Sequence, residues 1–560
     1  MKKIIALLLT FVLLTAQLGG TAFGDGIPTG TSFSEMEYVR PDSDGIVIAA
    51  AAVIEAVENG ENAAGIEERL STFFAEYYYF CTMSTLARVR YFQNMSDEFY
   101  TQEYTACSEM SGTVEMVAEL VYVACARCSY AKTLELDCFW EGFTEKYGAD
   151  PDASYSDTVI ELRNRESELI SEYYALTEAP VIYINGAEYD LNTVLSFSDE
   201  ETAYALQMEY LRQYNARFAD VYIELVKVRT QLAEELGYES VWDMQCELFG
   251  RDFSGEQMSA FLNDTAAEIA PLYAQLIESG KSVEGLVIDE EMLMKLMDGV
   301  TSQIGGYTDE AYKYMKAYGL YDISQAENKA PMSFTAYLDL FVSPFSFVSC
   351  NSTEEDIFLF SHEFGRFVQM YRNSSGRASN DTAECCSRAM EMLTVGKANM
   401  ILKEKYAKIL REYKMFDILV SYIEQGMLAR FEELVYSVDP GQLSAEALNM
   451  ISQQCADEFG LSQVYDAEYC AMFWSDVQNF YEYPFYAVSN IIAADAAMQI
   501  YEAEREAPGK GAELFDSLLP YAGRKVVEAM ECAGLSSPFE SGRLASTAKT
   551  LREELISGTD

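Results

Sequence analysis

The chain has 560 residues, and its 39 Lys and Arg against 90 Asp and Glu give a net charge of −51. This charge argues against a nucleic-acid-binding protein, because such proteins neutralise the phosphate backbone with Lys and Arg, and it also disfavours an anionic membrane surface. His362 is the single histidine, so zinc sites built from two or three imidazoles are excluded.

The first 24 residues have the pattern of a secretory signal peptide. Lys2 and Lys3 precede a mostly apolar run over residues 4–14, and small residues follow before Asp25. The run is too short to cross a bilayer, and no later stretch is long and apolar enough for a transmembrane helix. The sequence therefore predicts a secreted or extracytoplasmic protein that is not inserted in a membrane after signal cleavage.

Most of the mature chain has the apolar spacing of long helices, three and four residues apart, with 12 prolines in all. Two segments break this pattern. In residues 181–191, two β-branched and aromatic runs flank the pair Asn185-Gly186, which predicts a small β-hairpin. Residues 334–350 are rich in Phe, Val, Tyr and Ser, and we expect one or two strands there.

The most informative helix follows this second segment. We expect it to begin at Ser352, which has the spacing of a capping box with Glu355. It contains His362-Glu363-x-x-Arg366, which is the zincin motif His-Glu-x-x-His with arginine in place of the second histidine. In the intact motif both histidines bind zinc and the glutamate activates the metal-bound water. Arg366 cannot ligate zinc, because a guanidinium has no free lone pair and stays protonated.

A second helical segment carries two glutamates, Glu384 and Glu391, which are seven residues apart and therefore lie on one face. Together the two segments resemble the oligoendopeptidase F and thimet oligopeptidase family of zinc metallopeptidases. In that family an Ala-Glu-x-x-Ser-x-x-x-Glu helix follows the motif helix. The resemblance implies that Glu384 is the third zinc ligand and that Glu391 is an acid behind the ligands.

The resemblance extends over most of the mature chain. Leu232–Tyr238 resembles the Leu-Gly-Tyr start of the family's catalytic half, and residues 344–351 resemble the strand and loop before its metal-binding helix. Residues 474–490 resemble its substrate-stabilising segment. There Asn479 takes the place of the family's histidine, and Tyr486 is the tyrosine that remains of its final aromatic run.

The resemblance implies a mostly α, two-lobed helical fold of the zincin metallopeptidase type. It also implies a deep central channel and a small β element beside the active-site helix. We expect residues 1–24 to be the signal peptide and residues 25–230 to be a helical N-terminal lobe that carries the hairpin. Residues 231–560 would form the peptidase-like catalytic lobe.

The family's activity is zinc-dependent cleavage of short peptides. In an active enzyme, the resemblance implies that His362 and Glu384 bind zinc, that Glu363 is the general base and that Tyr486 donates to the oxyanion. A peptide would lie extended beside the strand near residues 345–350 and pair with a sheet edge.

The arginine at the second ligand position leads to a different hypothesis. We expect the guanidinium of Arg366 to stand where zinc stands in the family, pairing with Glu384 and with Glu363 or Glu391. Such a cation would compensate carboxylates that otherwise remain unpaired in a cleft. The protein would then bind short peptides, with metal-dependent hydrolysis lost or impaired.

Two alternatives remain open from the sequence. One is an active zinc metalloendopeptidase with an atypical metal site, in which Asp381 or Cys385 supplies the missing ligand. Helix geometry counts against Cys385, which points about 100° away from Glu384. The other is a non-enzymatic structural or scaffolding surface protein, which would have no affinity for peptides.

Overall fold

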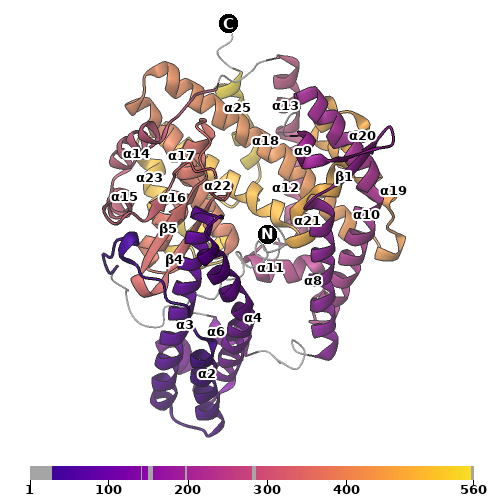
Figure 1. Ribbon diagram of the computed structural model, residues 1–560. Coiled ribbons are helices and arrows are strands. Elements are labelled where there is room, and N and C mark those ends of the chain that lie inside the picture. Colours follow the sequence, from indigo (N-terminus) through magenta and orange to yellow (C-terminus); the bar gives the residue numbers. More distant parts are fainter. Residues whose placement is uncertain are drawn as a thin grey trace.

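The computed structural model describes residues 28–140, 142–148, 156–195, 199–280, 285–376 and 378–556. The predicted signal peptide, residues 1–24, lies outside them. The described part of the chain is mostly α-helical, and its strands are short (Figure 1). The mostly α fold predicted from the sequence is therefore the one observed.

The N-terminal helices form a bundle that projects from the rest of the molecule, at the bottom of Figure 1 in indigo. The bundle consists of α2 (Ser43–Glu58), α3 (Ala63–Gln93), α4 (Glu98–Arg127), α5 (Ala131–Asp137) and α6 (Phe143–Tyr147). Its three long helices begin after Asp42, Asn62 and Asp97, whose side chains accept hydrogen bonds from backbone N–H groups of the first turn. The bundle encloses a hydrophobic core of its own, separate from the larger core of the remaining chain.

The predicted hairpin is present between two helices. Strands β1 (Val181–Ile184) and β2 (Ala187–Asp190) pair in antiparallel register. At the turn, Asn185 has φ 52° and Gly186 has φ 81°, the left-handed conformations that a two-residue hairpin loop requires. The neighbouring helices are α8 (Asp157–Thr177), α9 (Leu191–Leu195), α10 (Glu200–Glu235) and α11 (Val241–Phe249). The predicted boundary after residue 230 falls inside α10, and the division of the chain into two lobes at that point stays a prediction.

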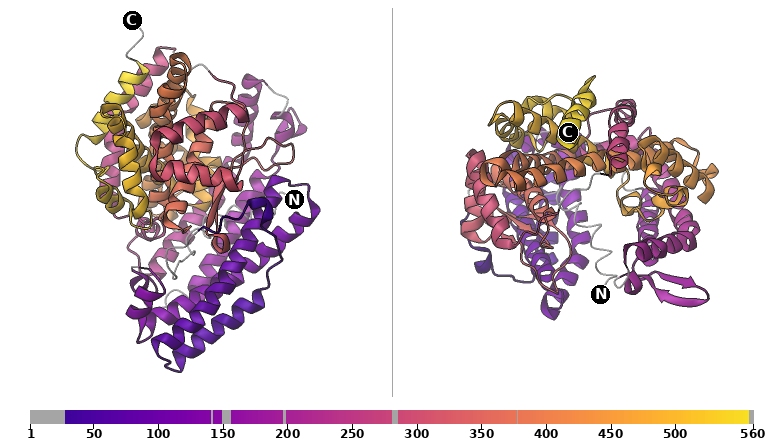
Figure 2. Two further views of the ribbon diagram at one scale, coloured as in Figure 1. Left: turned by 90° about the vertical axis from the view of Figure 1, so that its left-hand side faces the viewer. Right: turned by 90° about the horizontal axis from the view of Figure 1, so that it is seen from above.

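The larger part of the molecule is built from fourteen further helices of the described chain. They are α12 (Gly255–Glu268), α13 (Ala270–Glu278), α14 (Glu290–Ile304), α15 (Gly306–Tyr318), α16 (Glu355–Asn373), α17 (Asn380–Ile401), α18 (Glu404–Ser437), α19 (Ala445–Phe459), α20 (Ala467–Met472), α21 (Gln478–Glu482), α22 (Tyr486–Glu506), α23 (Lys510–Leu518), α24 (Val526–Ala533) and α25 (Arg543–Leu555). Seen from above in Figure 2, the hairpin side and the α14–α16 side lie apart, and the long α18 runs between them. The molecule thus has the two-lobed arrangement expected from the sequence.

A small sheet lies directly before α16. Its strands are β3 (Tyr321–Asp322), β4 (Phe334–Leu338) and β5 (Ser343–Phe347), in the order β3-β5-β4. Because β5 pairs in parallel with β3 and antiparallel with β4, it is the central strand. An edge for an added strand is therefore offered by β4 rather than by the paired residues of β5, and the expected pairing of a peptide near residues 345–350 stays a prediction.

Helix α16 begins at Glu355, three residues later than predicted. The predicted capping box is absent, because Ser352 has φ 62° and so lies outside a helical N-cap conformation. Instead the carboxylate of Asp356 accepts hydrogen bonds from the backbone N–H groups of Asn351 and Ser352, each at 2.8 Å. This carboxylate therefore fixes the loop that leads from β5 into the motif helix.

A buried ion pair joins α17 to the segments on either side of it. The Nε of Arg251 lies 2.9 Å from Oδ2 of Asp381, and both side chains are fully buried. The same guanidinium donates to the carbonyl oxygen of Phe485 at 2.8 Å, and the hydroxyl of Ser489 donates to Asp381 at 2.5 Å. The end of α11, the start of α17 and the start of α22 are thus held together by one charged network.

Replacing Arg251 with Met tests this network. The variant keeps most of the side-chain volume but leaves the carboxylate of Asp381 buried without its guanidinium. Because an uncompensated buried charge is costly, we expect the free energy of unfolding to fall by about 3–5 kcal/mol in denaturant titrations. Lys510→Met is the matched control, since it breaks an exposed 3.0 Å pair with Glu513 and should change stability by about 0–1 kcal/mol. Equal losses in the two variants would contradict this account.

Candidate active site

The close approach of α16 to α17 brings the motif side chains together. A β-carbon at Gly365 would lie 2.6 Å from the carbonyl oxygen of Cys386 and 2.8 Å from the α-carbon of Ser387. Both contacts are to backbone atoms, which cannot move aside, so no other residue fits at this position without separating the helices. Gly365 lies between His362 and Arg366 in the chain. The close approach that it permits therefore brings both of their side chains near α17.

A cavity of about 510 Å³ opens beside these helices. Apolar, acidic and basic side chains from α16, α17 and α18 line it. Residues of the segments that flank β4 and β5 complete the lining. It includes Phe358, His362, Glu363, Arg388 and Lys414. A cavity with a few converging charged groups on an apolar wall is the usual form of a small-ligand site.

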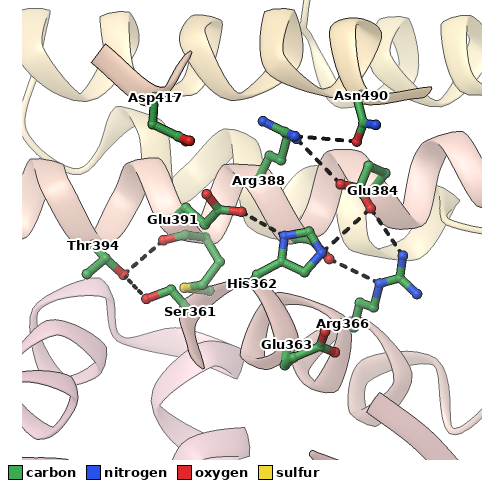
Figure 3. A network of polar contacts seen from close by, with 12 residues as sticks. Ser361, His362, Glu363, Arg366, Glu384, Arg388, Glu391, Thr394, Asp417 and Asn490 are labelled. Carbon is green, nitrogen blue, oxygen red and sulfur yellow. Dashed lines mark hydrogen bonds and ion pairs between the residues drawn. The ribbon is translucent and has the colours of Figure 1, made fainter. Parts of the chain in front are cut away.

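The single histidine lies between two glutamates of α17 (Figure 3). Its Nδ1 is 2.7 Å from Oε1 of Glu391, and its Nε2 is 3.6 Å from Oε2 of Glu384. Burial alone lowers the pKa of His362, but the negative charges of Glu384 and Glu391 outweigh burial and raise that pKa above its ordinary value. The two glutamates of α17 therefore favour the charged form of the imidazole.

Arg366 reaches the same glutamate as His362 does (Figure 3). One guanidinium nitrogen of Arg366 donates to Oε2 of Glu384 at 3.1 Å, and its Nε donates to the hydroxyl of Ser387 at 3.3 Å. The other oxygen of Glu384 faces Nε of Arg388 at 3.4 Å. Burial raises the pKa of Glu384, but His362, Arg366 and Arg388 outweigh burial and lower it below its ordinary value. The pairing of Arg366 with Glu384 expected from the sequence is present.

Glu391 pairs with a lysine from a third helix. Lys414 on α18 is almost fully buried and forms an ion pair with Glu391, and its Nζ also lies 2.6 Å from Asp417. Burial raises the pKa of Glu391, but Lys414 and the hydrogen bond to His362 outweigh burial and lower it to about 2. The ionised form of Glu391 is consequently favoured, and its ion pairs link α16, α17 and α18.

Glu363 has a different environment from the two α17 glutamates. Its side chain is 6% exposed, and its Oε2 accepts a hydrogen bond from Oγ1 of Thr335 on β4 at 2.8 Å. The same hydroxyl lies 2.9 Å from the backbone carbonyl oxygen of Glu363. No Lys, Arg or His of the described chain has a nitrogen within 4.0 Å of this carboxylate. Glu363 therefore stands in the cavity wall without a paired cation.

The comparisons with known proteins agree with this geometry. Residues 33–143 match the family model described as the Peptidase M3 N-terminal domain. A solved structure of PZ peptidase A with an inhibitor superposes with a TM-score of 0.78 at 22% identity, covering 94% of this chain and 99% of that one. The chain has the M3 peptidase fold of the oligoendopeptidase F type. The family resemblance stated from the motifs is thereby confirmed.

Two further structures support the M3 fold. A Bacillus anthracis protein provisionally assigned as oligoendopeptidase F has a TM-score of 0.75 at 20% identity, over 95% of this chain and 99% of that one. Oligoendopeptidase F from Enterococcus faecium has a TM-score of 0.51 at 14% identity, over 91% and 97% of the two chains. No curated protein matches the sequence. None of the described helices is both long and apolar enough to cross a membrane.

The residues at the M3 zinc position do not fit a zinc ion. Within the described part of the chain, no three His, Cys, Asp or Glu side chains are placed to hold one metal ion. The two substitute ligands considered from the sequence, Asp381 and Cys385, are both engaged or buried. Asp381 is bound by Arg251. Cys385 is fully buried, and burial raises the pKa of its thiol well above its ordinary value, which disfavours the thiolate that zinc requires.

The remaining predicted residue, Tyr486, lies at the first position of α22 and is half-buried beside the network. Burial and the negative charge of Glu384 raise the pKa of Tyr486 to about 12, so the phenol stays protonated. Its hydroxyl makes no hydrogen bond within the residues that the structure describes. Asn479, at the position of the family's histidine, lies on the short α21 and is also half-buried.

Three residues of the site were not found from the sequence. Arg388 follows Glu384 by four residues on the same helix, so an i, i+4 search for ion pairs would have identified it. Lys414 comes from α18, and Thr335 comes from β4. Their positions depend on how distant elements pack against α16 and α17, and local spacing carries no signal for them.

The single histidine makes one titration unambiguous. In protein labelled with ¹⁵N-histidine, we expect the His362 imidazole to titrate with a pKa above its ordinary value of 6.5, because Glu384 and Glu391 stabilise the charged ring. This raised pKa contributes stability below the ordinary value, and the contribution is lost as the pH rises through the pKa of the folded protein. Glu391→Gln should lower the measured pKa. An imidazole that is neutral and does not titrate between pH 5 and 8 would instead indicate a metal ligand and contradict the ion network.

Proposed function

We propose that this protein is an exported relative of oligoendopeptidase F that binds short peptides, and that its metal-dependent peptide hydrolysis is lost or impaired. The observation that carries the proposal is the ion pair between Arg366 and Glu384, at 3.1 Å. The M3 family depends on zinc. In this chain the carboxylate at the third ligand position is already bound to an arginine at the second.

Electrostatics opposes a zinc ion at this place. A divalent cation about 4 Å from a guanidinium is repelled by about 8 kcal/mol at an effective dielectric constant near 20, which is twice the value for two unit charges. A complete four-ligand site contributes about 10–16 kcal/mol, and this chain offers two of the family's ligands, His362 and Glu384. The repulsion by Arg366 is therefore comparable to the binding free energy that half of the four ligands would supply. We expect zinc to bind weakly at best.

Peptide binding is supported by what remains of the site. The cavity keeps an apolar wall at Met332, Phe358 and Leu359 beside its charged groups. The segments that flank β4 and β5, including Ser333 and Ser349, line it as well, and β4 is an edge strand of the small sheet beside them. An extended peptide can pair with such a strand, as peptides do at sheet edges. The relative PZ peptidase A was solved with an inhibitor bound to it.

Export is the second part of the proposal. It rests on the charged, apolar and small-residue order of residues 1–24, which is the order of a secretory signal peptide. After signal cleavage the chain would be secreted or extracytoplasmic.

A second candidate is an active zinc endopeptidase with an atypical metal site. Glu363 favours this candidate, because its carboxylate lines the cavity and is hydrogen-bonded to Thr335 rather than paired with a cation. A general base has to reach the substrate in this way. Tyr486 also keeps a protonated phenol with a free hydroxyl. These two observations support the catalytic roles that the resemblance implies for Glu363 and Tyr486.

A peptidase assay separates the two candidates. The wild type, Arg366→His and Glu363→Gln are compared on a quenched fluorescent peptide library, with and without added zinc. We expect turnover only in Arg366→His with zinc, because that change restores the second ligand and removes the repelling cation. Wild-type turnover that Glu363→Gln abolishes would overturn the loss of hydrolysis. A wild type that neither cleaves nor binds any peptide of the library would favour a scaffolding protein.

A further inference from the structure

We infer that the cavity selects peptides that carry a primary ammonium group, and that Glu363 binds this group. The inference rests on the proposed peptide-binding function and adds the chemical class of the ligand. Either a lysine side chain or a free amino terminus would supply the ammonium.

The first step is the unequal pairing of the site's carboxylates. Glu384 faces Arg366 and Arg388, and Glu391 faces His362 and Lys414. Figure 3 shows the contacts of Glu384 and Glu391 with His362, Arg366 and Arg388, and none of these cations is joined to Glu363. Glu363 is 6% exposed and has no cation of the described chain within 4.0 Å, so His362 and Arg366 act on its carboxylate from a distance and it lacks a direct ion pair.

The second step concerns which atom of Glu363 is free. Oε2 accepts from Thr335, whereas Oε1 accepts no hydrogen bond from any residue that the structure describes. The carboxylate lines the cavity, so its free oxygen is the group that a ligand can reach. An acceptor that faces the cavity is open to water in the free protein, and a cationic donor of the ligand can take the place of that water in a charge-assisted hydrogen bond.

The third step distinguishes an ammonium from a guanidinium. A guanidinium binds a carboxylate best through two parallel hydrogen bonds, which require both carboxylate oxygens. Glu363 is 6% exposed and its Oε2 already has the hydroxyl of Thr335 against it, so little of the carboxylate edge is open to a planar two-point donor. A compact ammonium needs a single oxygen and can direct its other protons to nearby groups. The geometry therefore favours lysine or an amino terminus over arginine.

The mouth of the cavity has matching chemistry. Glu355, two turns before Glu363 on α16, is exposed, lines the cavity and pairs with no cation of the described chain. Phe358 and Tyr413 stack beside it, with ring centroids 5.8 Å apart and planes 2° apart. Aromatic faces and carboxylates both attract ammonium groups, and the Nζ of Lys414 already lies over the Phe358 ring, 5.1 Å from its centroid. The net charge of −51 also raises the local concentration of cationic peptides.

Isothermal titration calorimetry with three alanine pentapeptides tests the inference. The first is acetylated at its amino terminus and carries a central lysine, and the second has a free amino terminus and a central norleucine. The third is acetylated and carries norleucine, so it has no amine. We expect the wild type to bind one or both amine peptides at least about tenfold more tightly than the third, and the tighter of the two identifies the source of the ammonium.

Glu363→Gln is the decisive variant, because the amide keeps an acceptor for Thr335 and removes only the charge. It should bind all three peptides with the affinity of the amine-free one. Glu239→Gln is the matched control, since Glu239 is exposed on a loop and its change alters the net charge equally. This control should retain the tenfold preference. Thermal unfolding of both variants checks that they are folded.

Two results would overturn the inference and are distinguishable from each other. Equal affinity of the wild type for all three peptides, or a preference that survives in Glu363→Gln, would refute ammonium recognition and leave the proposed peptide binding standing. Absence of binding for every peptide, including the library of the peptidase assay, would refute the proposed function and this inference with it.

Discussion

The ion pair between Arg366 and Glu384 is the interaction on which the rest of this site depends. Glu384 and Glu391 are almost fully buried, and buried carboxylates require opposite charge close by. In a zinc peptidase the metal supplies much of that charge. In this chain it comes from side chains, with Arg366 and Arg388 on one glutamate and His362 and Lys414 on the other. The site is therefore complete as an ion network of the protein alone.

The close packing of α16 against α17 depends on a glycine and brings the charged groups of the network together. Gly365 allows α16 to touch the backbone of α17, and the charged groups on either side of it then lie within hydrogen-bond distance. Lys414 extends the network to α18, which runs between the two sides of the molecule. The site thus ties three helices together, and removal of any one charge would affect stability as well as ligand binding.

Much of the fold could be predicted, because it depends on local signals. The hairpin follows from Asn185-Gly186, whose positive φ angles define the turn. Other features failed because tertiary contacts overrode local ones. The side chain of Asp356 accepts from the backbone N–H of Ser352, which is the bond that Glu355 was expected to accept. Strand β5 is central because β3, from an earlier segment, pairs with it. Sequence spacing does not reveal which segment a strand will meet.

In the candidate site too, some residues could be predicted from local spacing and others depend on tertiary packing. The motif positions His362, Glu363 and Arg366 and the glutamates of α17 could be found from spacing, and so could the contact of Arg366 with Glu384. Lys414 could not be found, because its place beside Glu391 depends on the packing of α18. The isolation of Glu363 from the network is likewise a property of three-dimensional structure.

The metal content of the purified protein tests the central claim most directly. Mass spectrometry of protein expressed in zinc-supplemented medium, then dialysed against a weak chelator, gives the zinc bound per chain for the wild type and for Arg366→His. The account predicts no stoichiometric zinc in the wild type and a gain of zinc in Arg366→His, because the guanidinium holds Glu384 in place of the metal. About one tightly held zinc per wild-type chain would contradict it.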